Sequence, residues 1–128
     1  FILFLLNKTT QTPAFELVKT HVIHENDVAE LLGNIERYRV QSYSRSFNHN
    51  FVEQIGDNGS DEFTIEWNIS LRGSKKNGTL YVYQKGNGKE IVFEEVMLTV
   101  DKQKHYLTIE SVPMDEYHKL KRDLGARD

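Results

Sequence analysis

The chain of 128 residues contains no cysteine, only two prolines and no apolar run longer than six residues. The absence of cysteine excludes disulfides, thiol nucleophiles, cysteine-ligated zinc and iron–sulfur clusters, but it leaves the redox compartment open, since a chain without thiols suits either kind. A net charge of -3 gives no overall attraction to nucleic acid or to an anionic membrane. With 38% hydrophobic and 27% charged residues, the composition is typical of one ordinary globular domain with one core.

The first six residues, FILFLL, are entirely apolar and are followed by the polar stretch NKTT. A membrane-spanning helix requires about 20 apolar residues, so this segment is too short to span. Two interpretations stay open at this point: the remnant of a truncated membrane anchor or signal core, and a first strand or packed terminus. Uniform apolarity without alternation counts against a half-buried strand.

Two short helices are predicted before Gly33. Thr12 can cap the first, and Pro13 suits its first position because the missing N–H would be unpaired there anyway. Apolar residues at spacings of three and four form one stripe, Phe15, Val18 and Val22. A break near residues 23–26 separates the second helix, which Asn26 or a neighbour can cap and which Gly33 can end in a left-handed conformation. Its expected apolar face consists of Val28, Leu31 and Leu32.

From Gly33 onward the apolar period changes to two. Strands are predicted at 36–47, 63–71, 79–84, 90–100 and 105–109, with a weaker one at 51–55 and with turns at 57–60 and 86–88. The parity slips at Glu94-Glu95, and a β-bulge there would put both apolar sets of that strand on the core side. Leu107 and Ile109 are expected to point inward. The predicted fold is therefore α+β, with one or two N-terminal helices packed on a twisted antiparallel β-meander.

After Pro113 the sequence becomes so charged that it predicts at most a loose helix, around Tyr117, Leu120 and Leu124. Under the anchor interpretation, residues 1–11 are an anchor remnant and linker; an α+β domain at 12–112 and a charged C-terminal tail at 113–128 are expected to follow.

No catalytic or metal-ligating constellation stands out, so the sequence predicts a non-enzymatic chain without a cofactor. His21 and His24 lie three residues apart, but the predicted helix break between them spoils the geometry of a metal site. The acidic stretch 57–61 resembles part of a calcium loop but lacks its distant glutamate. Glu94 and Glu95 are neighbours on a strand and point to opposite faces, so they do not form an acid–base pair.

Two groups of cations are candidates for binding a partner. Arg37, Arg39 and Arg45 share one parity on strand 36–47 and would form a basic stripe able to meet phosphates or an acidic partner, although such stripes are also common as plain solvated faces.

The second group lies in SLRGSKKNGTLYVY, residues 70–83, which is predicted to be a turn between antiparallel strands. Asn77-Gly78 favours positive φ, and Lys75 and Lys76 at the tip discourage pairing of strand edges. The residues selected for partner binding are Arg72, Lys75, Lys76, Asn77, Arg37 and Arg39.

Three segments together, VAELLGN (28–34), LRGSKKNGTLYVY (71–83) and IVFEEVMLTV (91–100), resemble the cytochrome c oxidase assembly factor 1 family. This family is similar in turn to a subunit of the mitochondrial presequence translocase. The residues that match the family pattern are Leu32-Gly33, Gly73-Ser74-Lys75, Gly78 and Leu80-Tyr81-Val82. The resemblance covers roughly residues 15–109. The proline usual after the helix-ending glycine is replaced by Asn34-Ile35.

The resemblance implies a single N-terminal membrane anchor, which favours the anchor interpretation of residues 1–6. It further implies a domain held in an aqueous compartment, the mitochondrial intermembrane space or a bacterial periplasm or cell surface. Its expected role is to bind a protein partner, not nucleic acid, during assembly or insertion of a membrane complex such as a respiratory oxidase. The alternative is a small-ligand-binding or enzymatic domain, with a pocket between the helices and the curved sheet that Trp67, Phe93 and Tyr81 would line instead of filling the core.

Overall fold

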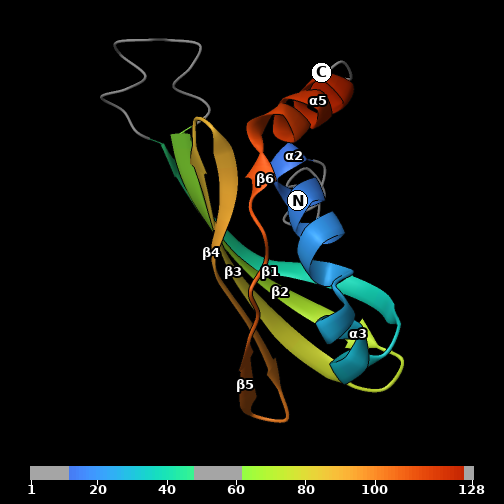
Figure 1. The fold of residues 1–128 in the computed structure, drawn as a ribbon. Coiled ribbons are helices and arrows are strands. Elements are labelled where there is room, and N and C mark those ends of the chain that lie inside the picture. The colour runs from blue at the N-terminus through green and yellow to red at the C-terminus, as the bar shows by residue number, and fades with distance from the viewer. Residues whose placement is uncertain (1–11, 48–61, 126–128) are drawn as a thin grey trace.

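A computed structural model of the chain describes residues 12–47 and 62–125. Helices lie on one side of an antiparallel sheet (Figure 1), which confirms the α+β architecture. The elements follow in the order α2 (Pro13–Val18), the π-helix η1 (Lys19–Ile23), α3 (Asn26–Leu32), β1 (Ile35–Phe47), β2 (Glu62–Gly73), β3 (Asn77–Asn87), β4 (Glu90–Val100), β5 (Gln103–Tyr106), β6 (Val112–Pro113) and α5 (Met114–Gly125). The anchor segment 1–6, the weak strand 51–55 and the turn 57–60 lie outside the described residues.

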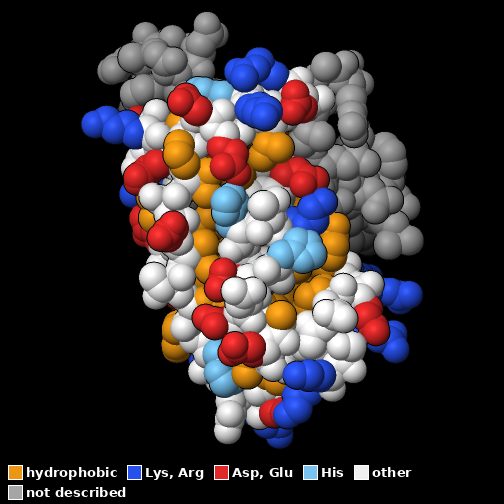
Figure 2. All heavy atoms as spheres, turned by 45° about the vertical axis from the view of Figure 1, so that its right-hand side comes forward, with side chains coloured by type: hydrophobic (Ala, Val, Ile, Leu, Met, Phe, Trp, Pro, Cys, Tyr) orange, Lys and Arg blue, Asp and Glu red, His pale blue; other side chains and the backbone are white. Residues whose placement is uncertain are grey.

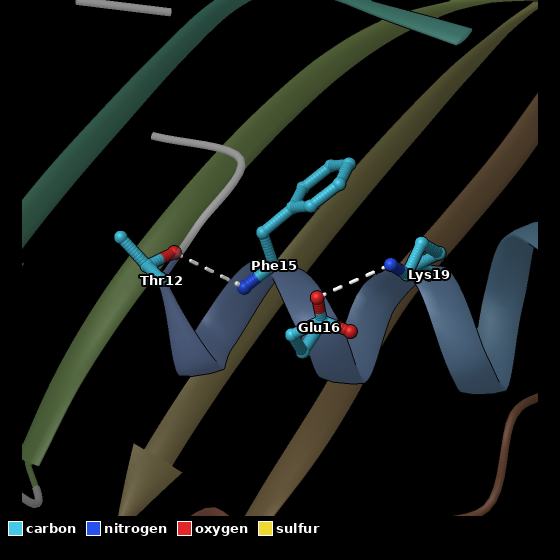
Figure 3. A network of polar contacts seen from close by, with 4 residues as sticks. All are labelled: Thr12, Phe15, Glu16 and Lys19. Carbon is cyan, nitrogen blue, oxygen red and sulfur yellow. Dashed lines mark hydrogen bonds and ion pairs between the residues drawn. The ribbon is translucent and has the colours of Figure 1, made fainter. Parts of the chain in front are cut away.

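The first helix begins as the sequence predicts. The Phe15 N–H donates to Thr12 Oγ1 at 3.3 Å, and Pro13 occupies the first turn. One turn on, Lys19 Nζ lies 3.1 Å from Glu16 Oε1, a partly buried pair at the spacing of neighbours on a helix (Figure 3). The chain passes directly from α2 into η1, which ends at Ile23, so the break lies at His24 and Glu25, within the predicted range 23–26.

The second helix, α3, is capped differently from the expectation. Its cap residue is Glu25, a neighbour of Asn26, and no side chain caps it. Gly33 ends the helix with φ 83° and ψ -155°. The positive φ is confirmed, but this backbone region is open essentially to glycine alone and differs from the left-handed helical one.

The sheet is a meander in the order β1-β2-β3-β4-β5, and β6 also pairs with β4. The free edge of β4 therefore pairs with β5 near Val100 and with β6 at Ile91. The predicted strand at 105–109 is wrong in its bounds, because a turn at Asp101 and Lys102, both with positive φ, lets β5 start at Gln103.

Leu107 and Ile109 still pack against the core, from a segment outside any strand. The Leu107 N–H donates to the Val96 carbonyl at 2.9 Å, which holds this segment along β4. The short strand β6 that follows was not predicted.

The bulge predicted in β4 is confirmed. Tyr83 pairs with Glu95 and Gln84 with Phe93, so Glu94 is the extra residue. As a result Ile91 and Phe93 are buried on the same side as Val96, Leu98 and Val100. Two further irregularities, in β1 between Ile35 and Arg37 and between Val40 and Ser42, were not predicted.

The core lies between the helices and the inner face of the sheet, which is the face that the helices cover. Trp67 is 1% exposed and its ring centroid lies 5.2 Å from that of Phe15 on α2. The Trp67 Nε1–H donates to Gln84 Oε1 at 2.9 Å, and Gln84 Nε2 donates to the Ala14 carbonyl at 3.1 Å. The oxygen and the nitrogen of the Gln84 side chain thus each have a hydrogen-bond partner, as buried polar groups require. These two hydrogen bonds connect α2 to the middle of the sheet.

The C-terminal segment is more ordered than the sequence predicts. Residues 114–125 form the twelve-residue helix α5 instead of at most a loose helix. Met114 and Tyr117 are buried, and the ring centroids of Tyr117 and Phe63 are 5.5 Å apart. Glu116 Oε2 lies 2.8 Å from His21 Nε2 of η1. Two buried apolar side chains, Leu120 packed against the core and one polar contact therefore dock a helix that is charged at half of its positions.

Within residues 12–47 and 62–125, no helix combines the length and the apolar character needed to cross a membrane.

Candidate functional site

The loop between β2 and β3 is fixed by backbone hydrogen bonds to the end of α3. The N–H groups of Lys75 and Lys76 donate to the Leu32 carbonyl at 2.8 and 3.2 Å, and the Ser74 N–H donates to the Asn34 carbonyl at 2.8 Å. The Ser74 hydroxyl in turn accepts from the Asn34 N–H at 2.9 Å. The loop therefore supplies donors to a helix end whose last carbonyls have no partner within the helix.

Two glycines permit this close approach. A Cβ on Gly73 would lie 2.1 Å from the Leu32 carbonyl oxygen, and a Cβ on Gly33 would lie 2.3 Å from Ser74 Oγ. The two fragments that carry the family resemblance, Leu32-Gly33 and Gly73-Ser74-Lys75, thus pack directly on each other. Their residue types follow from this contact.

The predicted turn chemistry at Asn77-Gly78 is wrong. Both residues belong to β3, and Gly78 is not among the glycines with positive φ. The turn is instead closed by the Gly73 N–H, which donates to the Lys76 carbonyl at 3.0 Å. Gly78 lies where a Cβ would come within 3.1 Å of the Thr99 carbonyl oxygen, so close packing explains this glycine.

The two lysines at the loop tip have different surroundings. Lys76 Nζ forms an ion pair with Asp101 of the turn between β4 and β5. Lys75 is exposed and, within the part of the chain that the structure describes, forms no ion pair. Of the two, Lys75 carries the cation that is available to another molecule.

The selected arginines are brought together by the pairing of β1 with β2. Arg37 lies directly opposite Arg72, which is also the partner of Asn77 on β3. Arg39 lies two residues further along, opposite Ser70. All three arginine side chains are exposed and form no ion pair or hydrogen bond with other described residues. We call Arg37, Arg39, Arg72 and Lys75 the basic corner.

Arg45 does not belong to this stripe, contrary to the expectation. The irregularity between Val40 and Ser42 shifts the parity of β1, so Arg45 pairs with the buried Ile65 and shares the inner face. Its guanidinium carbon lies 5.4 Å from the centroid of the Phe63 ring, a cation–π geometry. An unpredicted bulge therefore removes one of the three arginines from the basic stripe.

The residues proposed to line a pocket do not share a face of the sheet. Trp67 and Phe93 point inward and are 1% and 6% exposed. Tyr81 is on the opposite face, where its hydroxyl donates to Glu66 Oε2 at 2.9 Å. Phe15 and Tyr43 pack on Trp67 with centroid distances of 5.2 and 5.4 Å. The indole ring is therefore packed between aromatic side chains as part of the core.

The surroundings of Tyr81 also alter its acidity. Burial, and then the hydrogen bond to Glu66 and the charges of Glu66 and Glu95, raise the pKa of Tyr81 from 10.0 to about 12. All of these effects disfavour the phenolate. Tyr81 is therefore held as a neutral donor on the outer face, the sheet face that points away from the helices.

The other polar candidates are dispersed. His21 contacts Glu116, whereas His24 is exposed beyond the end of η1. Over residues 12–47 and 62–125, no group of three or more His, Asp or Glu side chains is arranged to hold a metal ion. On the helical side, acidic and basic side chains are interspersed (Figure 2).

Comparisons with family models, with curated proteins and with solved structures find no match to this chain.

Proposed function

We propose that this chain is a membrane-tethered, non-enzymatic domain that binds a protein partner and assists the assembly or insertion of a membrane complex, such as a respiratory oxidase. The observation that carries the binding role is the basic corner. It gathers exposed cations from two strands and a loop at one end of the sheet, and these cations form no ion pair with other described residues. The assembly role and the tether rest on the family resemblance.

The rigidity of the loop supports a role in recognition. Three backbone N–H groups of residues 74–76 are bonded to Leu32 and Asn34, so Lys75 is presented on an ordered backbone. Binding to a loop that is already ordered costs less conformational entropy than binding that must first order a mobile loop. Unpaired cations at such a surface favour an acidic partner and raise the rate of encounter.

A charge reversal tests the binding role. Lys75→Glu removes the free cation of the loop without breaking its backbone bonds, whereas Lys75→Glu combined with Lys76→Glu also places a second acid beside Asp101. With a photoreactive amino acid at the exposed Asn77 of the full-length protein, we expect a crosslink to a partner in its own membrane, identified by mass spectrometry. The crosslink should weaken with the single reversal and weaken further with the double reversal.

Lys89→Glu is the matched control, because it makes the same charge change at the exposed turn between β3 and β4. It should leave the crosslink intact. Equal crosslink yields for wild type, Lys75→Glu and the double variant would remove the loop from the proposal. The tether is tested separately, since a full-length protein that leaves the membrane on alkaline extraction would not be anchored by a spanning segment.

A further inference from the structure

The outer face of the sheet carries one continuous row of side chains across all five strands of the meander. Successive cross-strand partners define it: Ser42, Asn68, Tyr81, Met97 and Tyr106. It changes from polar on β1 and β2 to aromatic and apolar on β3, β4 and β5, and Tyr106 is 67% exposed. We call this the middle row. No helix of the described residues covers it (Figure 1).

Basic residues lie on one side of the middle row. The next row contains Arg39 on β1 and Lys104 on β5, and the row after that contains Arg37 and Arg72. Like charges that pair directly, as Arg37 and Arg72 do, repel each other. An anionic group of another molecule would therefore relieve this repulsion and stabilise this end of the face.

Acidic residues lie on the other side of the middle row. Here Glu66, Tyr83 and Glu95 are cross-strand partners, and Glu94 is the exposed bulge residue beside them. Lys85 lies one row further, and its Nζ is 3.9 Å from Glu94 Oε1, so this cation is offset by Glu94 of its own chain. The basic and acidic ends are thus separated by the middle row and do not neutralise each other.

We propose that the outer face binds a second copy of this chain face to face. The two copies are related by a two-fold axis that runs parallel to the middle row, between the two sheets. A rotation of 180° about that axis places the basic end of one copy over the acidic end of the other, and the reverse contact follows by symmetry. Tyr81 and Met97 lie at the centre. A second copy is the one partner whose complementary charge pattern is given by the sequence itself. Dimerisation rests on the proposed function in one respect, because both assign protein binding to exposed residues of this sheet.

The size of the face is compatible with a weak dimer. The four long strands β1 to β4, of at least eleven residues each, at a rise of about 3.3 Å and a spacing of about 4.8 Å, give a face of roughly 700 Å² per copy, to which the four-residue β5 adds little. Twisted sheets pack face to face with an angle of about 30° between their strands. The total of roughly 1,400 Å² lies toward the lower end of the range for specific interfaces, so dimerisation should depend on concentration and on salt.

Sedimentation equilibrium of the full chain over a concentration series tests the proposal. Wild type should dimerise at low ionic strength, and added salt should weaken the dimer because exposed charges are screened. Arg39→Glu with Arg72→Glu cancels the positive charge of the basic end, where Arg37 and Lys104 remain, and leaves the face acidic overall. Glu66→Lys with Glu95→Lys reverses the charge of the acidic end, where Glu94 remains, and leaves the face basic overall. Each double variant alone should self-associate at least about tenfold more weakly, since like charges across an interface are costly.

Mixing the two double variants should restore a dimer, because an acidic face then meets a basic one. Lys89→Glu, which lies in the turn between β3 and β4, is the control and should dimerise as wild type does. Wild type that stays monomeric throughout the series, double variants that dimerise as strongly as wild type, or a mixture that stays monomeric would each overturn the proposal. Dimers that survive both reversals would point to pairing along the edge of β1.

Failure of this proposal is distinguishable from failure of the proposed function. Lys75 belongs to the loop and not to the rows of the outer face, so Lys75→Glu should leave the dimer unchanged and weaken only the partner crosslink. A chain that is monomeric but still crosslinks its partner through Asn77 would refute self-association alone. A chain that dimerises but gives the same crosslinks with and without Lys75 would refute only the role of the loop.

Discussion

The two faces of the sheet are built from the same strands, yet they differ in almost every physical property. The inner face is filled by residues such as Trp67 and Ile69, which are at most 1% exposed, and its buried polar residue, Gln84, has a partner on each side. The outer face holds half-exposed aromatics and charges that are sorted along the strands. Burial without unpaired polar groups favours stability, whereas exposed, ordered charge favours binding.

The contrast also separates what substitutions should do. A change on the inner face should alter the free energy of unfolding and reach binding only through loss of the fold. A change on the outer face should alter binding and leave folding nearly intact. The following predictions test this division.

The largest effect is expected from Trp67→Ala, because it leaves a cavity beneath α2 and removes the donor to Gln84. It should lower the free energy of unfolding by about 3–5 kcal/mol, measured by urea denaturation. Tyr83→Ala, an aromatic truncation on the outer face of the neighbouring strand, is the matched control and should cost no more than about 1 kcal/mol. Equal losses for the two variants would mean that the outer face contributes as much to the free energy of unfolding as the inner face does.

Gly73→Ala should come next, at about 2–3 kcal/mol, because the new Cβ must displace the Leu32 carbonyl at the end of α3. Thermal unfolding and amide exchange of the Lys75 and Lys76 N–H groups would measure the loss. Ser74→Ala is the control for the loop, since it removes one hydrogen bond at an exposed site and should cost about 1 kcal/mol or less. If Gly73→Ala were neutral, the contact between the loop and α3 would not constrain either segment.

The smallest effect concerns Tyr81 and alkaline pH. Because the folded-state pKa of Tyr81 is raised from 10.0 to about 12, the neutral form is favoured by folding, and the associated stability is fully present below pH 10 and lost as pH rises toward 12. Tyr81→Phe should remove this part of the pH dependence of unfolding. An absorbance titration of tyrosinate should lose a component near 12 in the variant. A wild-type titration in which all tyrosines ionise near 10 would contradict the hydrogen bond to Glu66.

Several features were readable from the sequence because they depend on neighbours along the chain. Thr12-Pro13 starts α2 as predicted, since a cap is satisfied within one helical turn. The slip in parity at Glu94 identified the β4 bulge, because a strand must keep its apolar residues on one side.

The errors fall where distant segments decide the local structure. In β1, Tyr43 and Arg45 follow an irregularity that only pairing with β2 reveals, and it moved Arg45 away from the basic corner. Helix α5 is charged at half of its positions, so the spacing of Tyr117, Leu120 and Leu124 predicted only a loose helix, whereas packing on distant segments buries Met114 and Tyr117. Gly73 looked like a turn residue, and only the end of α3 explains it.

The sequence by itself determined the alternation of β2, the start of α2 and the identities of the exposed cations, because these follow from side-chain periodicity and local hydrogen bonding. Only the tertiary structure decided that Arg37 and Arg72 face each other, that Lys76 is paired while Lys75 is not, and that Tyr81 lies on the face opposite Trp67. These relations depend on strand register and on contacts between residues tens of positions apart, and no local pattern specifies either.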